Sequence, residues 1–361
     1  MFDKHPAFIV RVESPFNGGA PPALVAQHAI TPNDLFFVRS HADVPPVDLA
    51  AFRLNVDGLV RHPLRLGLDD LRQFPRRTLV AALQCAGNRR VEMEQVAPIP
   101  DEIIWGIEAV GNAEWSGVLL ADVLRAAGVD ESADALHVAF EGLDQNEKEG
   151  KTFAFGGSIP LDKALRPEVL LADIMNGAPL LPAHGFPLRV VVPGYIGARS
   201  VKWLTRITVQ AQPSDNYYQA HAYKLFPADV DKESVDWAQG MMLGELPVNA
   251  LIAQPEEGAV LRAGEVIVRG HALAGGRRVE RVDVSCNGGA TWQLAAFVSD
   301  PTLWGWRLWE TRLMLTPGEH TLMARAWDSA AQTQPESVST IWNFKGYMNN
   351  AVHRVKMTVT A

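Results

Sequence analysis

The sequence predicts an α+β domain followed by an all-β sandwich. Up to about residue 246, strand-like apolar runs and helix-like segments occur without regular strand–helix alternation, which is typical of an α+β domain. Beyond Leu246, helix signals vanish and turn signals recur, a pattern typical of a sandwich of about seven strands. A chain of 361 residues is also too long for one ordinary core. We therefore expect a first domain over residues 1–246, including a wrapping segment at 1–34, and a second domain over 247–361.

Three segments of the first domain carry clear local signals. Residues 52–60 alternate apolar and polar side chains around an Asp-Gly pair, which predicts two strands joined by a tight turn. Residues 67–74 resemble a short helix that ends before a proline. The clearest helix is expected at 117–127, with Ser116 as its N-cap and Gly128 just past its end. Short strands are expected at 137–141, 188–192 and 201–209.

Composition excludes several classes of protein. The net charge of -8 argues against non-specific binding of nucleic acid, which requires basic surface. Cys85 and Cys286 are too few for a disulfide framework, and their flanks lack the spacing of a zinc site. No window approaches the roughly 18 apolar residues of a membrane span. The first residues lack a basic and apolar leader, so we expect a cytoplasmic protein as given, or a periplasmic one if an export leader was removed.

The most informative run is Leu83-Gln84-Cys85-Ala86-Gly87-Asn88-Arg89-Arg90. It places one thiol at the end of an apolar segment and two guanidinium groups directly after it. Nearby cations favour the thiolate, which is the form that binds a metal or attacks an electrophile. The alternative is that Cys85 is an ordinary buried cysteine at the end of a strand over residues 78–83.

Four further stretches place polar or basic groups beside glycine-rich turns: residues 36–41, 141–144, 184–189 and 193–202. In the last of these, Arg199, Ser200 and Lys202 could meet a phosphate, although the stretch matches neither a Walker A loop nor a dinucleotide fingerprint. Asp144 could accept hydrogen bonds from ligand NH groups, and a tyrosine of residues 217–224 could bind an oxyanion. Taken singly, each residue also fits a structural role at a turn or an edge.

In this order the stretches resemble the sulfite oxidase family of molybdenum enzymes, from about residue 35 to the C-terminus. The most specific motifs are Cys-Ala-Gly-Asn-Arg-Arg at Cys85, His-Gly-Phe-Pro-x-Arg at His184 and Gly-Ala-Arg-x-Val-Lys-Trp at Gly197. Ile341-Trp342-Asn343 and His353-Arg354-Val355 complete the match. The resemblance implies a molybdopterin-binding α+β domain followed by an immunoglobulin-like domain that dimerises.

The resemblance also implies roles for individual residues. Cys85 matches the sulfur ligand of molybdenum. The positions that hold the pterin and its phosphate are Phe37, Val38, Arg39, Ser40, His41, Asp144, His184, Arg189, Ser200, Val201 and Lys202. The catalytic and substrate-binding positions, besides Cys85, are Arg39, Arg90, Trp105, Tyr223 and Lys345. Lys345 stands where vertebrate relatives have arginine, so it keeps the charge and loses the bidentate fork.

The resemblance finally implies an activity. We expect a haem-free homodimer that oxidises sulfite to sulfate by oxo transfer at a Cys-ligated molybdenum and passes electrons to a separate acceptor, dioxygen or a cytochrome. No haem is expected in this chain, and neither nucleic acid nor a membrane is an expected partner. A sulfane-sulfur dehydrogenase, or an enzyme acting on another small oxyanion or S-oxide, is the first alternative. A non-catalytic binding protein built on the β sandwich is the second.

Overall fold

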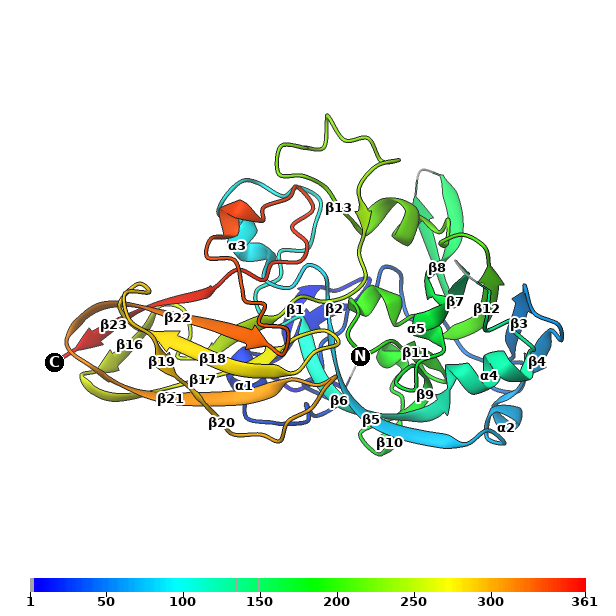
Figure 1. Ribbon diagram of the computed structural model, residues 1–361, viewed down its shortest axis with the longest axis horizontal. Coiled ribbons are helices and arrows are strands. Elements are labelled where there is room, and N and C mark those ends of the chain that lie inside the picture. Colours follow the sequence, from blue (N-terminus) through cyan, green and yellow to red (C-terminus); the bar gives the residue numbers. More distant parts are fainter. Residues whose placement is uncertain (1–2, 134–135, 149) are drawn as a thin grey trace.

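The computed structural model describes residues 3–133, 136–148 and 150–361 (Figure 1). It is built mostly of strands with few and short helices, as an α+β fold followed by a β sandwich requires. Most of the first half lies on the right of Figure 1 and the sandwich on the left, with the C-terminus at the far end of the sandwich. Among the described residues, no helix is long and apolar enough to cross a membrane.

The first half contains two five-stranded sheets. One has the order β10-β9-β6-β5, with β11 also paired to β9, and comprises β5 (Arg76–Gln84), β6 (Val110–Leu119), β9 (Leu170–Met175), β10 (Ala178–Pro179) and β11 (Arg189–Val191). The other has the order β4-β3-β12-β7-β8 and comprises β3 (Leu54–Gly58), β4 (Leu64–Leu66), β7 (His137–Lys148), β8 (Lys151–Pro160) and β12 (Leu204–Gln210). Buried side chains of both sheets form one hydrophobic core, to which Val118, Leu171, Phe140 and Ile207 belong.

Helices of the first half are short, and one of them begins later than its sequence suggests. They are α1 (Pro22–Val25), α2 (Leu68–Leu71), α3 (Arg90–Glu94), α4 (Leu120–Ala126) and α5 (Leu161–Ala164), with single turns η1 (Pro182–His184), η2 (Gly197–Arg199) and the π-helical η3 (Tyr218–Ala222). The helix expected at 117–127 is α4, but its N-cap is Leu119 and not Ser116. Ser116 and Gly117 extend β6, because hydrogen bonding to β9 continues to Leu119 across a bulge. The helix does end before Gly128, which has a φ of +74°.

The strand pair expected within residues 52–60 is also corrected. Asp57 and Gly58 do not form a tight turn; both lie in β3, where they pair with Thr208 and Val209 of β12. The partner on the other side is β4, so the chain reverses between residues 58 and 64. The Asp-Gly pair therefore marked the end of a strand and not the tip of a hairpin.

The C-terminal part is a sandwich of two sheets. One has the order β15-β17-β21-β20 and comprises β15 (Asn249–Gln254), β17 (Gly264–Leu273), β20 (Ala296–Phe297) and β21 (Arg307–Leu315). The other has the order β16-β23-β22-β18-β19 and comprises β16 (Ala259–Arg262), β18 (Val279–Ser285), β19 (Gln293–Leu294), β22 (Gly318–Asp328) and β23 (His353–Thr360). Alternate residues of both sheets, such as Val268, Trp309, Leu322 and Val355, share one core. A single turn, η4 (Val338–Thr340), precedes the loop that returns to the first half.

A smaller cluster connects the sandwich to the first half. Trp306 and Leu308 pack with Val25, Val110 and Tyr347 in a buried cluster that joins both parts of the chain. The N-terminal segment contributes the pair β1 (Ile9–Val12) and β2 (Asn17–Gly19), and a short pair of β13 (Lys224–Leu225) with β14 (Met241–Met242) precedes the sandwich. The sandwich is therefore packed against the elements that carry the functional site.

Candidate functional site

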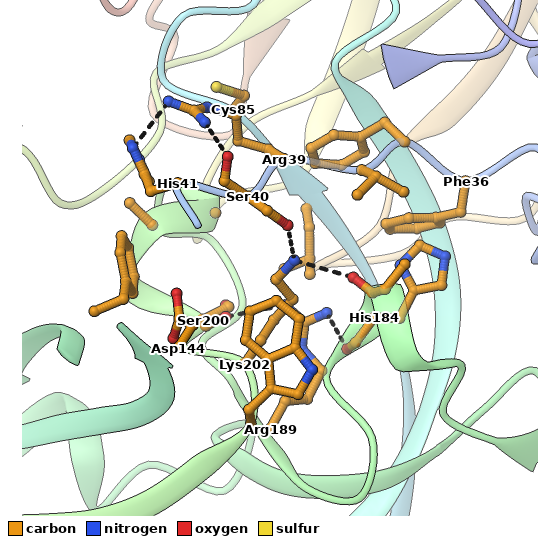
Figure 2. A pocket seen from close by; sticks show the side chains of 18 of the residues that line it. Phe36, Arg39, Ser40, His41, Cys85, Asp144, His184, Arg189, Ser200 and Lys202 are labelled. Atoms are coloured by element: carbon orange, nitrogen blue, oxygen red, sulfur yellow. Dashed lines mark hydrogen bonds between the residues drawn. The ribbon is translucent and has the colours of Figure 1, made fainter. Parts of the chain in front are cut away.

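A pocket of about 690 Å³, including its open mouth, lies where several loops of the first half meet (Figure 2). Cys85 enters it directly after β5, Asp144 from β7, and His184 from the end of η1. Ser200 and Lys202 follow η2, and Tyr223 follows η3. The predicted residues that line it are Phe37, Val38, Arg39, Ser40, His41, Cys85, Asp144, His184, Arg189, Ser200, Lys202 and Tyr223.

Backbone hydrogen bonds fix the loops that carry these side chains. Val38 and Gly18 exchange hydrogen bonds at 2.8 and 3.0 Å, which tie residues 36–41 to β2. The Cys85 amide donates to the carbonyl of Ala109 at 2.9 Å, which continues the β5–β6 ladder to the thiol. Cys85 is therefore held directly after the end of β5 and before the turn at residues 86–89.

The thiol of Cys85 lies in a nearly closed environment. Its residue is 6% exposed, and its sulfur accepts one weak hydrogen bond from the Gly87 amide at 3.4 Å. Burial lowers the pKa of Arg39, but Tyr223, Cys85 and other acidic groups around it together raise that pKa above its ordinary value. Figure 2 shows the sulfur beside the Arg39 guanidinium at one end of the pocket. A cysteine placed in this way is suited to act as a thiolate ligand.

Arg39, His41 and Tyr223 form one hydrogen-bonded group. The Nη2 of Arg39 lies 3.1 Å from Nδ1 of His41, and Nε2 of His41 lies 2.8 Å from the Tyr223 hydroxyl. Burial, and then the Arg39 charge, hold the pKa of His41 well below its ordinary value, so the imidazole is neutral. Burial raises the pKa of Tyr223, which keeps the phenol protonated. The group therefore offers one fixed cation and one O–H donor to an anion.

A second group of cations gathers at the other end of the pocket. Lys202 donates to Ser40 Oγ at 2.6 Å and to the Ala183 carbonyl at 3.0 Å, and Arg189 donates to the carbonyls of His184 and Ser200, both at 2.9 Å. Burial lowers the pKa of Lys202 to about 7 and that of Arg189 to about 9. Such a concentration of buried positive charge is unfavourable unless a polyanion binds to it.

Unpaired buried polar atoms support the same conclusion. Arg189 Nε and Asp144 Oδ1, both from residues that line the pocket, are buried without a hydrogen-bond partner in the described chain. Arg199 does not line the pocket, and its guanidinium donates to the Leu243 carbonyl at 2.8 Å. Unpaired buried polar atoms are rare in folded proteins and cost free energy unless a ligand pairs with them. The cations suit a phosphate, and the Asp144 oxygen suits an NH group of a heterocycle. The donor set therefore fits a phosphorylated pterin whose metal is reached by Cys85.

The remaining predicted residues lie beside the pocket and not on its lining. Arg90 begins α3, is 2% exposed, and donates to the carbonyls of Ile103 and Lys345 at 2.6 and 3.1 Å. Its guanidinium covers the Cα of Gly87, two residues after Cys85. Lys345 forms an ion pair with Glu102. Trp105 is fully buried in the cluster that contains Cys85, and its Nε1 has no partner among the described residues.

Val201 is placed differently from its neighbours in the sequence. Its side chain is 1% exposed and packs in the core between the two sheets. Its carbonyl accepts a hydrogen bond from the Val190 amide at 2.9 Å. The side chain of Val201 therefore supports the segment that carries Ser200 and Lys202, and does not line the pocket.

Sequence patterns missed several residues that the structure brings to the site. Lys4 reaches Nε2 of His184 at 3.0 Å from the N-terminal segment, and burial lowers its pKa to about 7. Trp203 closes the pocket beneath Lys202, whose Nζ lies 4.3 Å from the ring centroid. Glu102 binds Lys345, and Tyr347 stacks on Tyr223 with ring centroids 5.3 Å apart. Only Trp203 had a signal in the sequence, since it ends the motif at Gly197.

Comparison with known proteins agrees with the geometry. Residues 41–218 match the family described as "Oxidoreductase molybdopterin binding domain", and residues 241–360 match "Mo-co oxidoreductase dimerisation domain". The chain is 44% identical to "Sulfite oxidase, mitochondrial" of Homo sapiens over 99% of its length and 67% of the human protein. It is 38% identical to "Sulfite oxidase" of Arabidopsis thaliana over 98% of its length and 94% of the plant protein.

A solved structure shares the whole architecture. The sulfane dehydrogenase SoxCD from Paracoccus pantotrophus superimposes with a TM-score of 0.81 at 24% identity, covering 97% of this chain and 88% of that one. This likeness concerns the fold, and it confirms the predicted α+β domain followed by a sandwich. Together with the sequence matches across nearly the full length, it shows that the chain belongs to the sulfite oxidase family of molybdopterin-binding oxidoreductases.

Proposed function

We propose that this protein oxidises sulfite to sulfate at a molybdenum centre held by molybdopterin and by the thiolate of Cys85. The observation that carries the proposal is the convergence of one buried cysteine, the cation Arg39 and the pair of cations Lys202 and Arg189 in a single pocket. The overall reaction takes one sulfite and one water to sulfate, two protons and two electrons. When bound, the molybdenum cofactor supplies two-electron oxygen-atom transfer, which side chains alone do not provide.

Residues at the Lys202 end of the pocket would hold the pterin and its phosphate. Lys202 and Arg189 bring positive charge, and Ser200 and Ser40 bring hydroxyl groups to the same surface. Asp144 presents the unpaired Oδ1 oxygen to ring NH groups, while His184 stays neutral because burial and Lys4 lower its pKa. Phe37, Val38 and His41 complete the wall of the pocket.

Residues at the Cys85 end would bind the substrate. Arg39 lines the pocket beside Cys85, Arg90 ends the cysteine run, and the Lys345 carbonyl accepts a hydrogen bond from Arg90. Cations withdrawn from bulk water attract a small dianion strongly and hold it near the reacting metal. The protonated phenol of Tyr223 can donate a hydrogen bond to a sulfite oxygen, and the unpaired Nε1 of Trp105 can act as a further donor.

We further propose the division of labour between the two parts of the chain. Residues 1–246 would form the catalytic domain, with 1–34 wrapping over it, and 247–361 would form a dimerisation domain. The match of residues 241–360 to a dimerisation family supports a homodimer. Electrons would leave one at a time to an external acceptor, dioxygen or a cytochrome.

Elemental analysis and reduction kinetics test the proposal together. Protein expressed in a host that makes the cofactor should contain about one molybdenum atom per chain. Under anaerobic conditions, sulfite should bleach the absorption of the oxidised centre, whereas thiosulfate should do so far more slowly. Molybdenum without a response to sulfite would overturn the substrate, and protein without molybdenum would overturn the cofactor.

A further inference from the structure

We propose that Glu102 is an internal anion that pairs with the substrate-binding cations Lys345 and Arg90 in the resting enzyme. Its carboxylate must move away from these cations when the substrate anion binds. The inference rests on the proposed function and assigns Glu102 as a residue that sets anion affinity and selectivity. Its basis is the cluster of Glu102, Lys345 and Arg90 beside the Cys85 run.

The contacts of Glu102 identify its partners. Its Oε1 oxygen accepts from Lys345 Nζ, and its Oε2 oxygen lies 3.5 Å from Arg90 Nη2. Both cations belong to the proposed substrate site. The carboxylate is therefore negative and contacts two cations, as a small oxyanion bound at the same position would do.

The electrostatic reach of Glu102 extends to the pocket itself. After burial, the charge of Glu102 is the largest influence that raises the pKa of Tyr347, whose ring stacks on Tyr223. The same charge contributes to the raised pKa of Arg39, in which burial acts in the opposite direction. The charge of Glu102 therefore acts on Arg39 of the proposed substrate site and opposes the approach of a substrate dianion.

Exposure makes displacement of the carboxylate feasible. The side chain of Glu102 is 14% exposed and that of Lys345 is 19% exposed, whereas Arg90 is only 2% exposed. Arg90 is also fixed by carbonyl groups, whereas Lys345 Nζ contacts Glu102 and faces the ring of Tyr347, whose centroid lies 5.8 Å away. Lys345 and Glu102 can thus separate beside the pocket while Arg90 stays in place. An oxygen of the substrate can then take the place of the Glu102 carboxylate.

The adjacent acid provides a matched control. Asp101 lies next to Glu102 in the same loop, is largely exposed, and binds the exposed Lys232 at 2.5 Å. Asp101 has a φ of +64°, a conformation that asparagine tolerates well. Asp101→Asn therefore removes the same charge from the same loop without releasing Lys345.

The test uses holoenzyme and two measurements. Glu102→Gln should lower KM for sulfite about tenfold and tighten the binding of sulfate, measured by calorimetry on the oxidised enzyme, by a similar factor. Asp101→Asn should change both constants by less than about twofold. In a Lys345→Gln background the effect of Glu102→Gln should largely disappear, because the two groups act as a pair.

Each outcome decides the question. A KM and a sulfate affinity that stay unchanged in Glu102→Gln, or weaken, would overturn the inference and show that Glu102 only orients Lys345. An equal effect of Asp101→Asn would also overturn it, since loop charge alone would then explain the result. Wild-type enzyme that holds molybdenum but ignores sulfite would instead refute the proposed function, so the two failures are distinguishable.

Discussion

Cys85 concentrates the proposed chemistry in one atom. Its residue is buried, and among the described residues its sulfur accepts one weak hydrogen bond, so few polar contacts of the fold depend on it. We expect Cys85→Ser to lose sulfite oxidation by more than about 100-fold, because a hydroxyl is a poor ligand for molybdenum and stays protonated. The melting temperature should change by only a few degrees. Activity, molybdenum content and thermal unfolding measured on one preparation check this.

Cys286 is the matched control for that experiment. It is a free cysteine in the sandwich and does not line the pocket. Cys286→Ser should keep both activity and molybdenum. Equal losses in the two variants would mean that thiol removal acts through stability and not through the metal.

Burial of Lys202 should make the free energy of unfolding of the cofactor-free protein depend on pH. Burial lowers its pKa to about 7 from an ordinary 10.5, so between these values the unfolded chain binds more protons than the folded one. The contribution of Lys202 to stability therefore rises with pH over that interval, and its cost is fully present below pH 7. We expect Lys202→Met to flatten the rise and to stabilise the cofactor-free protein at pH 7 by about 1–2 kcal/mol. Urea unfolding at several pH values measures this change in stability, with the exposed Lys356→Met as control. Parallel curves of unfolding free energy against pH for Lys202→Met and wild type would refute the prediction.

Gly117 shows how one element boundary is set by packing and not by local sequence. The local sequence at Ser116 and Gly117 predicts the start of a helix. In the structure, Gly117 lies so close to β9 that a Cβ there would overlap the carbonyl oxygen of Leu171. We expect Gly117→Ala to destabilise the protein by about 2 kcal/mol or more, because backbone must move to admit the methyl group. Gly67→Ala is the control, since its nearest new contact would be an ordinary 3.5 Å. Chemical denaturation compares them, and equal stabilities of the two variants would contradict the argument.

Elements that depend on local side-chain patterns could be predicted from the sequence. Strands of the sandwich follow from alternating apolar residues between turns, because each strand has one buried face. The end of α4 follows from Gly128, whose positive φ suits glycine. The start of α4 depends on pairing with Ala172 and its neighbours in β9, and Gly58 pairs with Val209 of β12. These partners are distant in the chain, so local patterns hold no information about them.

At the scale of the whole molecule, some site residues lie together in short sequence motifs, and others come from distant parts of the chain. The runs at Cys85, His184 and Gly197 could be predicted because each places several site residues within a few positions of one another. Lys4 and Glu102 could not, because their partners His184 and Lys345 lie 180 and 243 positions away. Only the folded chain brings these groups together, and they are the ones that adjust the charge of the pocket.

Arg89 links this site to the sandwich. It is fully buried, pairs with Glu92 at 2.6 Å, and donates to Asn249 Oδ1 of β15 at 2.9 Å and to the Ala351 carbonyl at 2.7 Å. Asn349 in turn donates to the Arg89 carbonyl at 3.0 Å. Arg89, four residues after Cys85, is thus hydrogen-bonded to two segments of the C-terminal part. The position of the segment that carries Cys85 therefore depends on the packed sandwich.

This arrangement predicts a pH-dependent cost of removing Arg89. Burial would raise the pKa of Glu92, but Arg89 lowers it below its ordinary value. That stabilisation is present above pH 4.5 and is lost as pH falls through the lowered pKa. Arg89→Met should therefore cost about 3 kcal/mol at pH 7, because it leaves a buried carboxylate unpaired, and less at pH 4 to 5, where Glu92 of the variant binds a proton. Adding Glu92→Gln should recover part of the loss at pH 7. Urea unfolding of the single and double variants at both pH values measures the coupling, and a cost that is independent of pH and of Glu92 would show that Arg89 acts by packing alone.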